Sequence, residues 1–174
     1  YAEQSSASAA VQVFGTDLDV AKAGMTDANI WNYPSVDIDA AYEPIFHGKM
    51  PRDDFFFLSS PSLKDPISGV KAPPGHHTLE FVTMAPYEPF AQWADKPTMK
   101  RGEEYNAFKS QLAERYMKHV ERHVPGVSEH LDVLEVGTPV TNVNYTLAPF
   151  GAVYGPEHTP APWGQPRYQL EGPL

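Results

Sequence analysis

One stretch of the chain has a clear helical period, and this period limits what the rest can fold into. Between residues 102 and 123, apolar side chains recur at spacings of three and four and form one stripe: Tyr105, Phe108, Leu112, Tyr116 and Val120. Acidic residues at its start and basic residues near its end suit the helix dipole, and Pro125-Gly126 ends the segment. The sequence therefore predicts a long amphipathic helix that lays one face on an apolar partner.

Four short segments have the composition or alternation of β-strands: residues 10–14, 54–59, 77–83 and 131–136. The first should be broken by Gly15 and the residues after it. Three consecutive phenylalanines in the second suggest burial on both faces, and Leu79 and Phe81 alternate in the third. The turn formers in 61–75 favour antiparallel pairing of the second and third strands. The predicted fold class is α+β, with a mixed or antiparallel sheet covered on one side by the helix at 102–123.

Two segments have no sustained period. Residues 17–50 carry aromatic side chains among prolines and glycines, which predicts an ordered excursion packed on the domain, because disordered segments are poor in aromatics. Residues 137–170 mix glycine, proline and aromatics. Aromatic rings flank turns in the second half of the chain, where they either fill a core or line a ligand pocket. These rings belong to Phe90, Trp93, Tyr145, Phe150, Tyr154, Trp163 and Tyr168.

Charge and composition argue against several classes of partner, chemistry and location. The 174 residues suit one domain, and a net charge of -9 disfavours nucleic acid as a partner. The absence of cysteine excludes disulfides and thiolate chemistry. No apolar run approaches the roughly 20 residues that span a bilayer, and the N-terminus has no signal-peptide pattern. The compartment stays open; the expectation is a cytoplasmic protein, soluble or in peripheral contact with a membrane, and a homo-oligomer is also open.

Motifs for metal, hydrolytic or nucleotide chemistry are weak. His76-His77 and the pair His119 and His123, one helical turn apart, are the metal candidates, but a structural role explains the helical pair and no metal site is predicted. The serines near residue 60 sit in no G-x-S-x-G elbow. Neither G-x-G-x-x-G nor a P-loop occurs. The sequence itself thus names no catalytic residue.

Several motifs occur in an order that resembles the C-terminal half of the phytoene desaturase-like flavoproteins. They are DFFFLSSPSLKDP at 54–66, APPGHHTLEFVTMAPYEPF at 72–90, the helix EEYNAFKSQLAERYMKHVERHVPG at 103–126, and EVGTPVTNVNYTLAPFGAVYGPEHTP at 135–160. Within them, Tyr105 to Lys109 matches a Y-x3-K helix pattern, and Gly137-Thr138-Pro139, Tyr145-Thr146 and Tyr154-Gly155-Pro156 follow in order. The likeness covers about residues 50–172, and more loosely residues 10–50.

The resemblance implies the substrate domain of a two-domain, FAD-dependent oxidoreductase of the desaturase, saturase or isomerase type. Its substrate would be a long apolar polyene or lipid-like molecule. The resemblance implies substrate contacts from Tyr145, Thr146, Tyr154 and Gly155, and cofactor contacts from Thr138 and Pro139. The family's FAD-binding motifs are absent from this chain, so the FAD would be held mostly by other sequence.

This interpretation divides the chain into three parts. Residues 1–50 are an irregular leader and the first strand, 51–136 the sheet and helix of the substrate domain, and 137–174 a return segment toward the FAD-binding domain. Because the chain starts without methionine and ends in a turn-like Glu-Gly-Pro-Leu, we expect a piece of a longer polypeptide, completed by its remainder or by a second chain. The alternative is a non-catalytic lipid- or carotenoid-binding or assembly subunit derived from the same fold.

Overall fold

One five-stranded sheet organises residues 7–67 and 69–155, which are the part of the chain that the computed structural model describes. The strands are β1 Ala9–Thr16, β2 Ile30–Asn32, β3 Phe56–Ser59, β4 His77–Met84 and β5 Leu131–Gly137. The α-helices are α1 Ile38–Phe46, α2 Pro61–Lys64, α3 Glu103–His123 and α4 Pro139–Thr146. Short 3-10 helices are η2 Glu88–Trp93, η3 Val127–Glu129 and η4 Pro149–Gly151. The predicted α+β class is confirmed.

The strand order is β2-β3-β4-β1-β5, and every neighbouring pair is antiparallel. The predicted break of the first strand at Gly15 is wrong, because β1 continues to Thr16. The register of β1 with β5 shifts between Gly15 and Thr16, which indicates a β-bulge at this point. A Cβ atom at Gly15 would lie 3.3 Å from the Cβ atom of Val133, so the glycine allows β5 to approach closely at this point.

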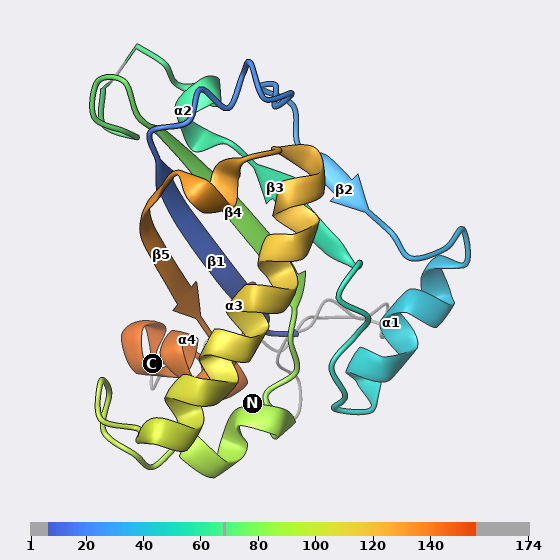
Figure 1. The fold of residues 1–174 in the computed structure, drawn as a ribbon. Coiled ribbons are helices and arrows are strands. Elements are labelled where there is room, and N and C mark those ends of the chain that lie inside the picture. Colours follow the sequence, from blue (N-terminus) through green and yellow to red (C-terminus); the bar gives the residue numbers. More distant parts are fainter. Residues whose placement is uncertain (1–6, 68, 156–174) are drawn as a thin grey trace, which may run out of the picture.

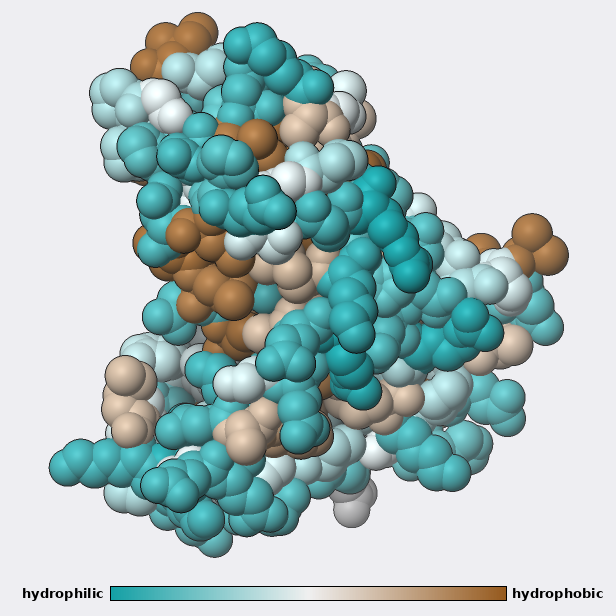
Figure 2. All heavy atoms as spheres, in the orientation of Figure 1, coloured by the Kyte–Doolittle hydropathy of each residue, from teal (hydrophilic) through white to brown (hydrophobic). Residues whose placement is uncertain are grey.

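Helix α3 crosses one face of the sheet, as Figure 1 shows, and Figure 2 shows mostly hydrophilic residues on the solvent side of this helix. Tyr116 stacks on Phe81 with ring centroids 4.8 Å apart, and Phe81 stacks on Phe56 at 4.7 Å. Burial of each such side chain stabilises the fold by roughly 1.5–3 kcal/mol. In the predicted apolar stripe, only Phe108 is not fully buried. Within the described ranges, none of the helices combines the length and apolar composition that a membrane-spanning segment needs.

Two longer helices lie in segments for which the sequence predicted no element. Helix α1 lies in the aromatic segment 17–50, so the predicted order is confirmed, and Asp37 accepts a hydrogen bond from the backbone of Ala40 at its start. Helix α4 begins with Thr138 at the N-cap position and Pro139 as its first residue. Its C-cap residue is Leu147, whose φ of 57° is left-handed. The absence of a predicted helix in this region was therefore wrong.

Candidate functional site

The sheet face that points away from α3 carries a row of apolar side chains. Trp31 pairs with Phe57, Phe57 with Val82, and Val82 with Val11, so four strands place these residues side by side. Antiparallel partners project to the same face, and strands lie about 4.8 Å apart, so the row is about 14 Å long. The rings of Trp31 and Phe57 are in contact, with centroids 4.9 Å apart.

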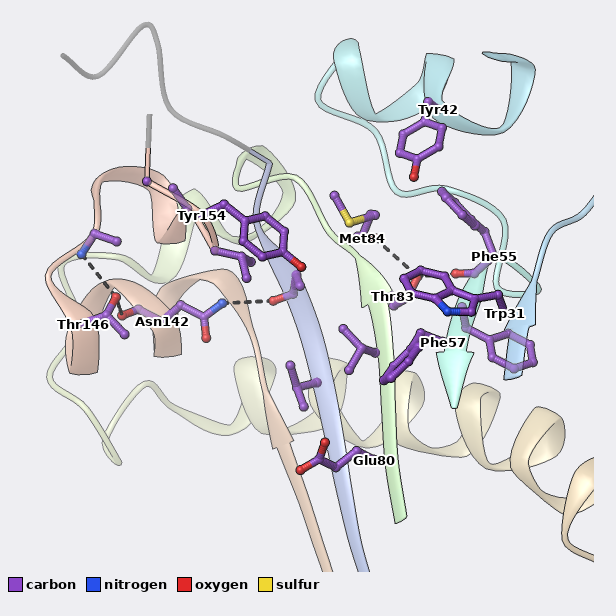
Figure 3. A pocket seen from close by; sticks show the side chains of 18 residues that line it. Trp31, Tyr42, Phe55, Phe57, Glu80, Thr83, Met84, Asn142, Thr146 and Tyr154 are labelled. Carbon is purple, nitrogen blue, oxygen red and sulfur yellow. Dashed lines mark hydrogen bonds between the residues drawn. The ribbon is translucent and has the colours of Figure 1, made fainter. Parts of the chain in front are cut away.

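This row forms the floor of a cavity of about 710 Å³. Figure 3 shows Trp31, Phe55 and Tyr42 of α1 on one side, and Thr146, Asn142 and Tyr154 on the other. The volume lies within the roughly 300–1,000 Å³ of typical small-molecule sites, and aromatic and aliphatic side chains dominate the lining. The arrangement suits an elongated apolar ligand that lies across the strands.

Three polar side chains of the cavity donate hydrogen bonds to backbone carbonyls. Thr83 Oγ1 donates to the carbonyl of Phe55 at 2.7 Å, and Asn142 Nδ2 donates to the carbonyl of Ala9 at 3.1 Å. Thr146 Oγ1 donates to the carbonyl of Asn142 at 2.8 Å. Burial and the neighbouring Tyr33 raise the pKa of Tyr42, so this phenol stays protonated at neutral pH.

Backbone strain marks the end of the cavity formed by α4 and η4. Leu147 and Phe150 have left-handed φ angles of 57° and 54°, which cost of order 1–3 kcal/mol each in a residue other than glycine. Gly151 follows with φ 67°, and its carbonyl accepts a 2.6 Å hydrogen bond from Ser8 Oγ. The Phe150 ring packs edge-on against Tyr87. Packing and hydrogen bonds thus hold this end in place.

The residues expected to contact substrate divide between two places. Thr146, Tyr154 and Gly155 line the cavity, whereas Tyr145 lines a second cavity at the start of α3. The sequence did not identify Trp31, Tyr42, Phe55, Phe57 and Met84, which also line the first cavity. The run of phenylalanines was the available signal: β3 begins at Phe56, and Phe57 is half-buried on the cavity side rather than buried in a second layer.

The two residues expected to contact a cofactor lie inside the domain. Thr138 is fully buried and its hydroxyl is 2.8 Å from the Tyr105 hydroxyl, and Pro139 is buried beside it. Their contact with a flavin stays a prediction. The described lining of the cavity has no basic side chain, and the amide of Asn142 and the hydroxyls of Thr83 and Thr146 donate to backbone carbonyls. These residues therefore fit an apolar molecule and do not by themselves fit a dinucleotide.

The histidine and serine candidates have structural partners. The rings of His119 and His123 pack on Phe56, with centroids 5.4 and 5.8 Å away, and burial lowers the pKa of His119. Ser62 Oγ is 3.3 Å from His77 Nδ1 and accepts a hydrogen bond from the backbone of Thr78. No group of three or more histidine, aspartate or glutamate side chains that could hold a metal occurs in residues 7–67 and 69–155.

The remaining aromatic residues named from the sequence serve mainly as core. Phe90 and Trp93 are buried, and both pack against Phe108 of α3. Trp163 and Tyr168 lie outside the described residues. Phe90 and Trp93 therefore fill the core, whereas Tyr154 lines the cavity, and its contact with a ligand stays a prediction.

Known proteins are similar to this sequence over most of its length. It is 30% identical to an all-trans-retinol 13,14-reductase of Danio rerio over 161 residues, which are 90% of this chain and 26% of that protein. It is 31% identical to the human all-trans-retinol 13,14-reductase over 140 residues, 77% of this chain and 22% of that protein. An inactive all-trans-retinol 13,14-reductase of Danio rerio is 28% identical over 134 residues, 74% of this chain and 22% of that protein.

No protein-family model matches the chain. The chain spans about a quarter of the length of the curated relatives it matches, 26% and 22% in the first two. The homology agrees with the likeness seen in the sequence motifs. The chain is homologous to one part of the all-trans-retinol 13,14-reductases.

Proposed function

We propose that this chain is the substrate-binding part of an oxidoreductase that acts on a retinoid or a similar polyene. The apolar cavity on the open face of the sheet is the observation that carries the proposal. Its floor, the row from Trp31 to Val11, is apolar and about 14 Å long, which matches an extended conjugated chain better than a compact polar substrate. The similarity to all-trans-retinol 13,14-reductases supports the same substrate class.

In this proposal the cavity residues bind and orient the polyene, and they supply no acid, base or nucleophile. Glu80 is the one carboxylate among the described lining residues. The redox chemistry would come from FAD, a cofactor bound mostly by sequence outside this chain. This chain's residues would hold the polyene against the sheet and exclude water from it, because the floor is apolar.

Fluorescence of Trp31 provides the test of binding. Titration of the purified full chain with all-trans-retinol should transfer excitation energy from Trp31 to the ligand, and Trp31→Phe should reduce the transfer to what Trp93 and Trp163 contribute, while binding persists. Phe57→Ala should weaken retinol binding by roughly tenfold, because it removes apolar contact area from the floor. Ile67→Ala, at an exposed position away from the cavity, serves as the control. Equal affinities for the two alanine variants would contradict the proposed site.

The second candidate is a polyene-binding or assembly protein without catalysis. An inactive all-trans-retinol 13,14-reductase among the relatives is the observation that favours it. Intact mass and absorbance between about 350 and 500 nm of the protein purified at its full length separate the two. Flavin bands with reduction of retinol would support the enzyme. Retinol binding without a flavin would support the binding protein.

A further inference from the structure

A second cavity lies between the start of α3, α4 and β5, and its polar lining differs from the first. It has a volume of about 410 Å³. Two cationic side chains, Arg101 and Lys109, line it, and both lie over the ring of Tyr105, at 5.4 and 5.9 Å from its centroid. Figure 1 shows α4 beside the N-terminal half of α3. The cavity therefore lies away from the sheet face that carries the apolar row.

Arg101 is unusual because it is buried with few partners. It is 6% exposed, and Nη2 donates a 3.2 Å hydrogen bond to the carbonyl of Val140. Its Nε is buried and has no hydrogen-bond acceptor. In the part of the chain that the structure describes, no ion pair joins Arg101 or Lys109 to a carboxylate. A buried charge without a counter-charge is costly, so an anion placed here would relieve that cost.

The turn that leads into Arg101 supplies a second unused donor. Thr98 lines the same cavity, and its Oγ1 is buried without a hydrogen-bond partner. The next residue, Met99, has a left-handed φ of 64°, and Lys100 N donates to the carbonyl of Pro97 across the turn. The strained turn holds Thr98 and Arg101 at the same cavity.

Neutral hydrogen-bonding groups complete the lining, together with one carboxylate that would repel a bound anion. Asn106, Thr141 and Tyr145 offer amide and hydroxyl groups. Glu135 also lines the cavity, and it is exposed on the edge strand β5. An exposed carboxylate is well screened by solvent, whereas the Arg101 guanidinium is buried, so the buried cation dominates the local field.

We propose that this cavity binds an oxyanion, a phosphate or carboxylate group of a small molecule, through Arg101 and Lys109. The planar guanidinium of Arg101 would contribute charge-assisted hydrogen bonds, and the ammonium group of Lys109 would add a second charge. Thr98 would donate its hydroxyl hydrogen. This site goes beyond the proposed polyene function, and it does not depend on it.

Calorimetric titration of the purified full chain with pyrophosphate, inorganic phosphate and acetate, at constant ionic strength, tests the proposal. Lys109→Gln should weaken anion binding by roughly tenfold, because one charge-assisted contact is lost. Lys118→Gln, at an exposed position on the same helix, should leave it unchanged. Arg101→Met should abolish binding, and if this variant fails to fold, the Lys109 and Lys118 pair still decides.

The outcomes separate the sources of the anion. Tighter binding of pyrophosphate and phosphate than of acetate would assign the site to a phosphate group, and the reverse order would assign it to a carboxylate. No binding of any of the three at millimolar concentration would overturn the proposal. Equal affinities of the Lys109 and Lys118 variants would also overturn it. Retinol affinity is measured separately, so failure of the polyene proposal would leave these results unaffected.

Discussion

The two faces of the sheet are built by alternate residues of the same strands, yet they are covered differently. On the face toward α3, Leu58 and Phe81 pair across β3 and β4 and are fully buried. On the other face, the neighbouring pair of Phe57 and Val82 is half-buried and forms the floor of the cavity. The comparison teaches that one face stabilises the domain by close packing, whereas the described residues leave a cavity on the other.

Neighbouring residues of β4 give the largest test of this comparison. Phe81→Ala should lower the free energy of unfolding by about 3–5 kcal/mol, because it removes the ring that links Phe56 and Tyr116. Val82→Ala, on the cavity face, should cost about 1 kcal/mol. Urea denaturation measures both. Equal costs would show that the open face contributes as much to stability as the covered face, and would break the comparison.

Substitution of two glycines tests how tightly the end of the cavity is packed. Gly151→Ala should destabilise the chain by about 2–4 kcal/mol, because a Cβ atom there would clash with the carbonyl oxygen of Pro139 and φ is 67°. Gly155→Ala is the matched control: its φ is 74°, but its Cβ would meet no atom within 4 Å, so about 1 kcal/mol is expected. Thermal unfolding compares the two. Equal shifts would mean that the contact with Pro139 does not constrain this end.

The covered face should also be sensitive to alkaline pH. Burial raises the pKa of Tyr116 above its usual value of 10.0, so the folded state keeps this proton while the unfolded state loses it. Stability from this group is complete below pH 10 and declines as pH rises, by up to about 1.4 kcal/mol per pH unit. Tyr116→Phe should flatten the dependence measured by urea denaturation between about pH 9 and 11.

Tyr145→Phe provides the control for this pH dependence, because its side chain is 70% exposed. This variant should retain the slope of the unmodified chain. An identical slope in the Tyr116 variant would contradict the assignment of the alkaline loss to the covered face.

The smallest expected effect concerns affinity at the open face. Glu80 is the only acidic side chain among the described residues that line the first cavity. Glu80→Leu should tighten binding of all-trans-retinol by roughly threefold, because a carboxylate no longer loses water when the ligand binds. Glu114→Leu, on the solvent side of α3, is the control. Unchanged or weaker retinol binding in the Glu80 variant would indicate that the ligand does not reach this part of the floor.

The two faces also differ in how much the sequence predicted. The stripe of α3 and the alternation of Leu79 and Phe81 are local patterns, so the covered face was predictable. The floor of the cavity depends on strand register, which places Trp31 beside Phe57 although no local pattern relates them. Helix α1 escaped prediction because it is short and contains Pro44.

The site residues were predictable only where a resemblance named them. Thr146, Tyr154 and Gly155 line the first cavity, and their contact with substrate stays a prediction. Arg101 had no sequence signal, because an arginine in a polar loop looks the same whether its guanidinium is exposed or buried. The signal for α4, a threonine followed by proline, was present at residues 138 and 139, and it is typical of a helix start.

The place of β1 between β4 and β5 has a consequence for synthesis of the chain. Phe14 pairs with both Leu79 and Leu134, which come much later in the sequence. At roughly 5–20 residues per second, strand β1 waits on the order of ten seconds for its last partner during translation. During that interval the apolar residues of β1 have no β5 partner and need protection by the ribosome or by chaperones. Translation is therefore the stage at which this sheet is most exposed to aggregation.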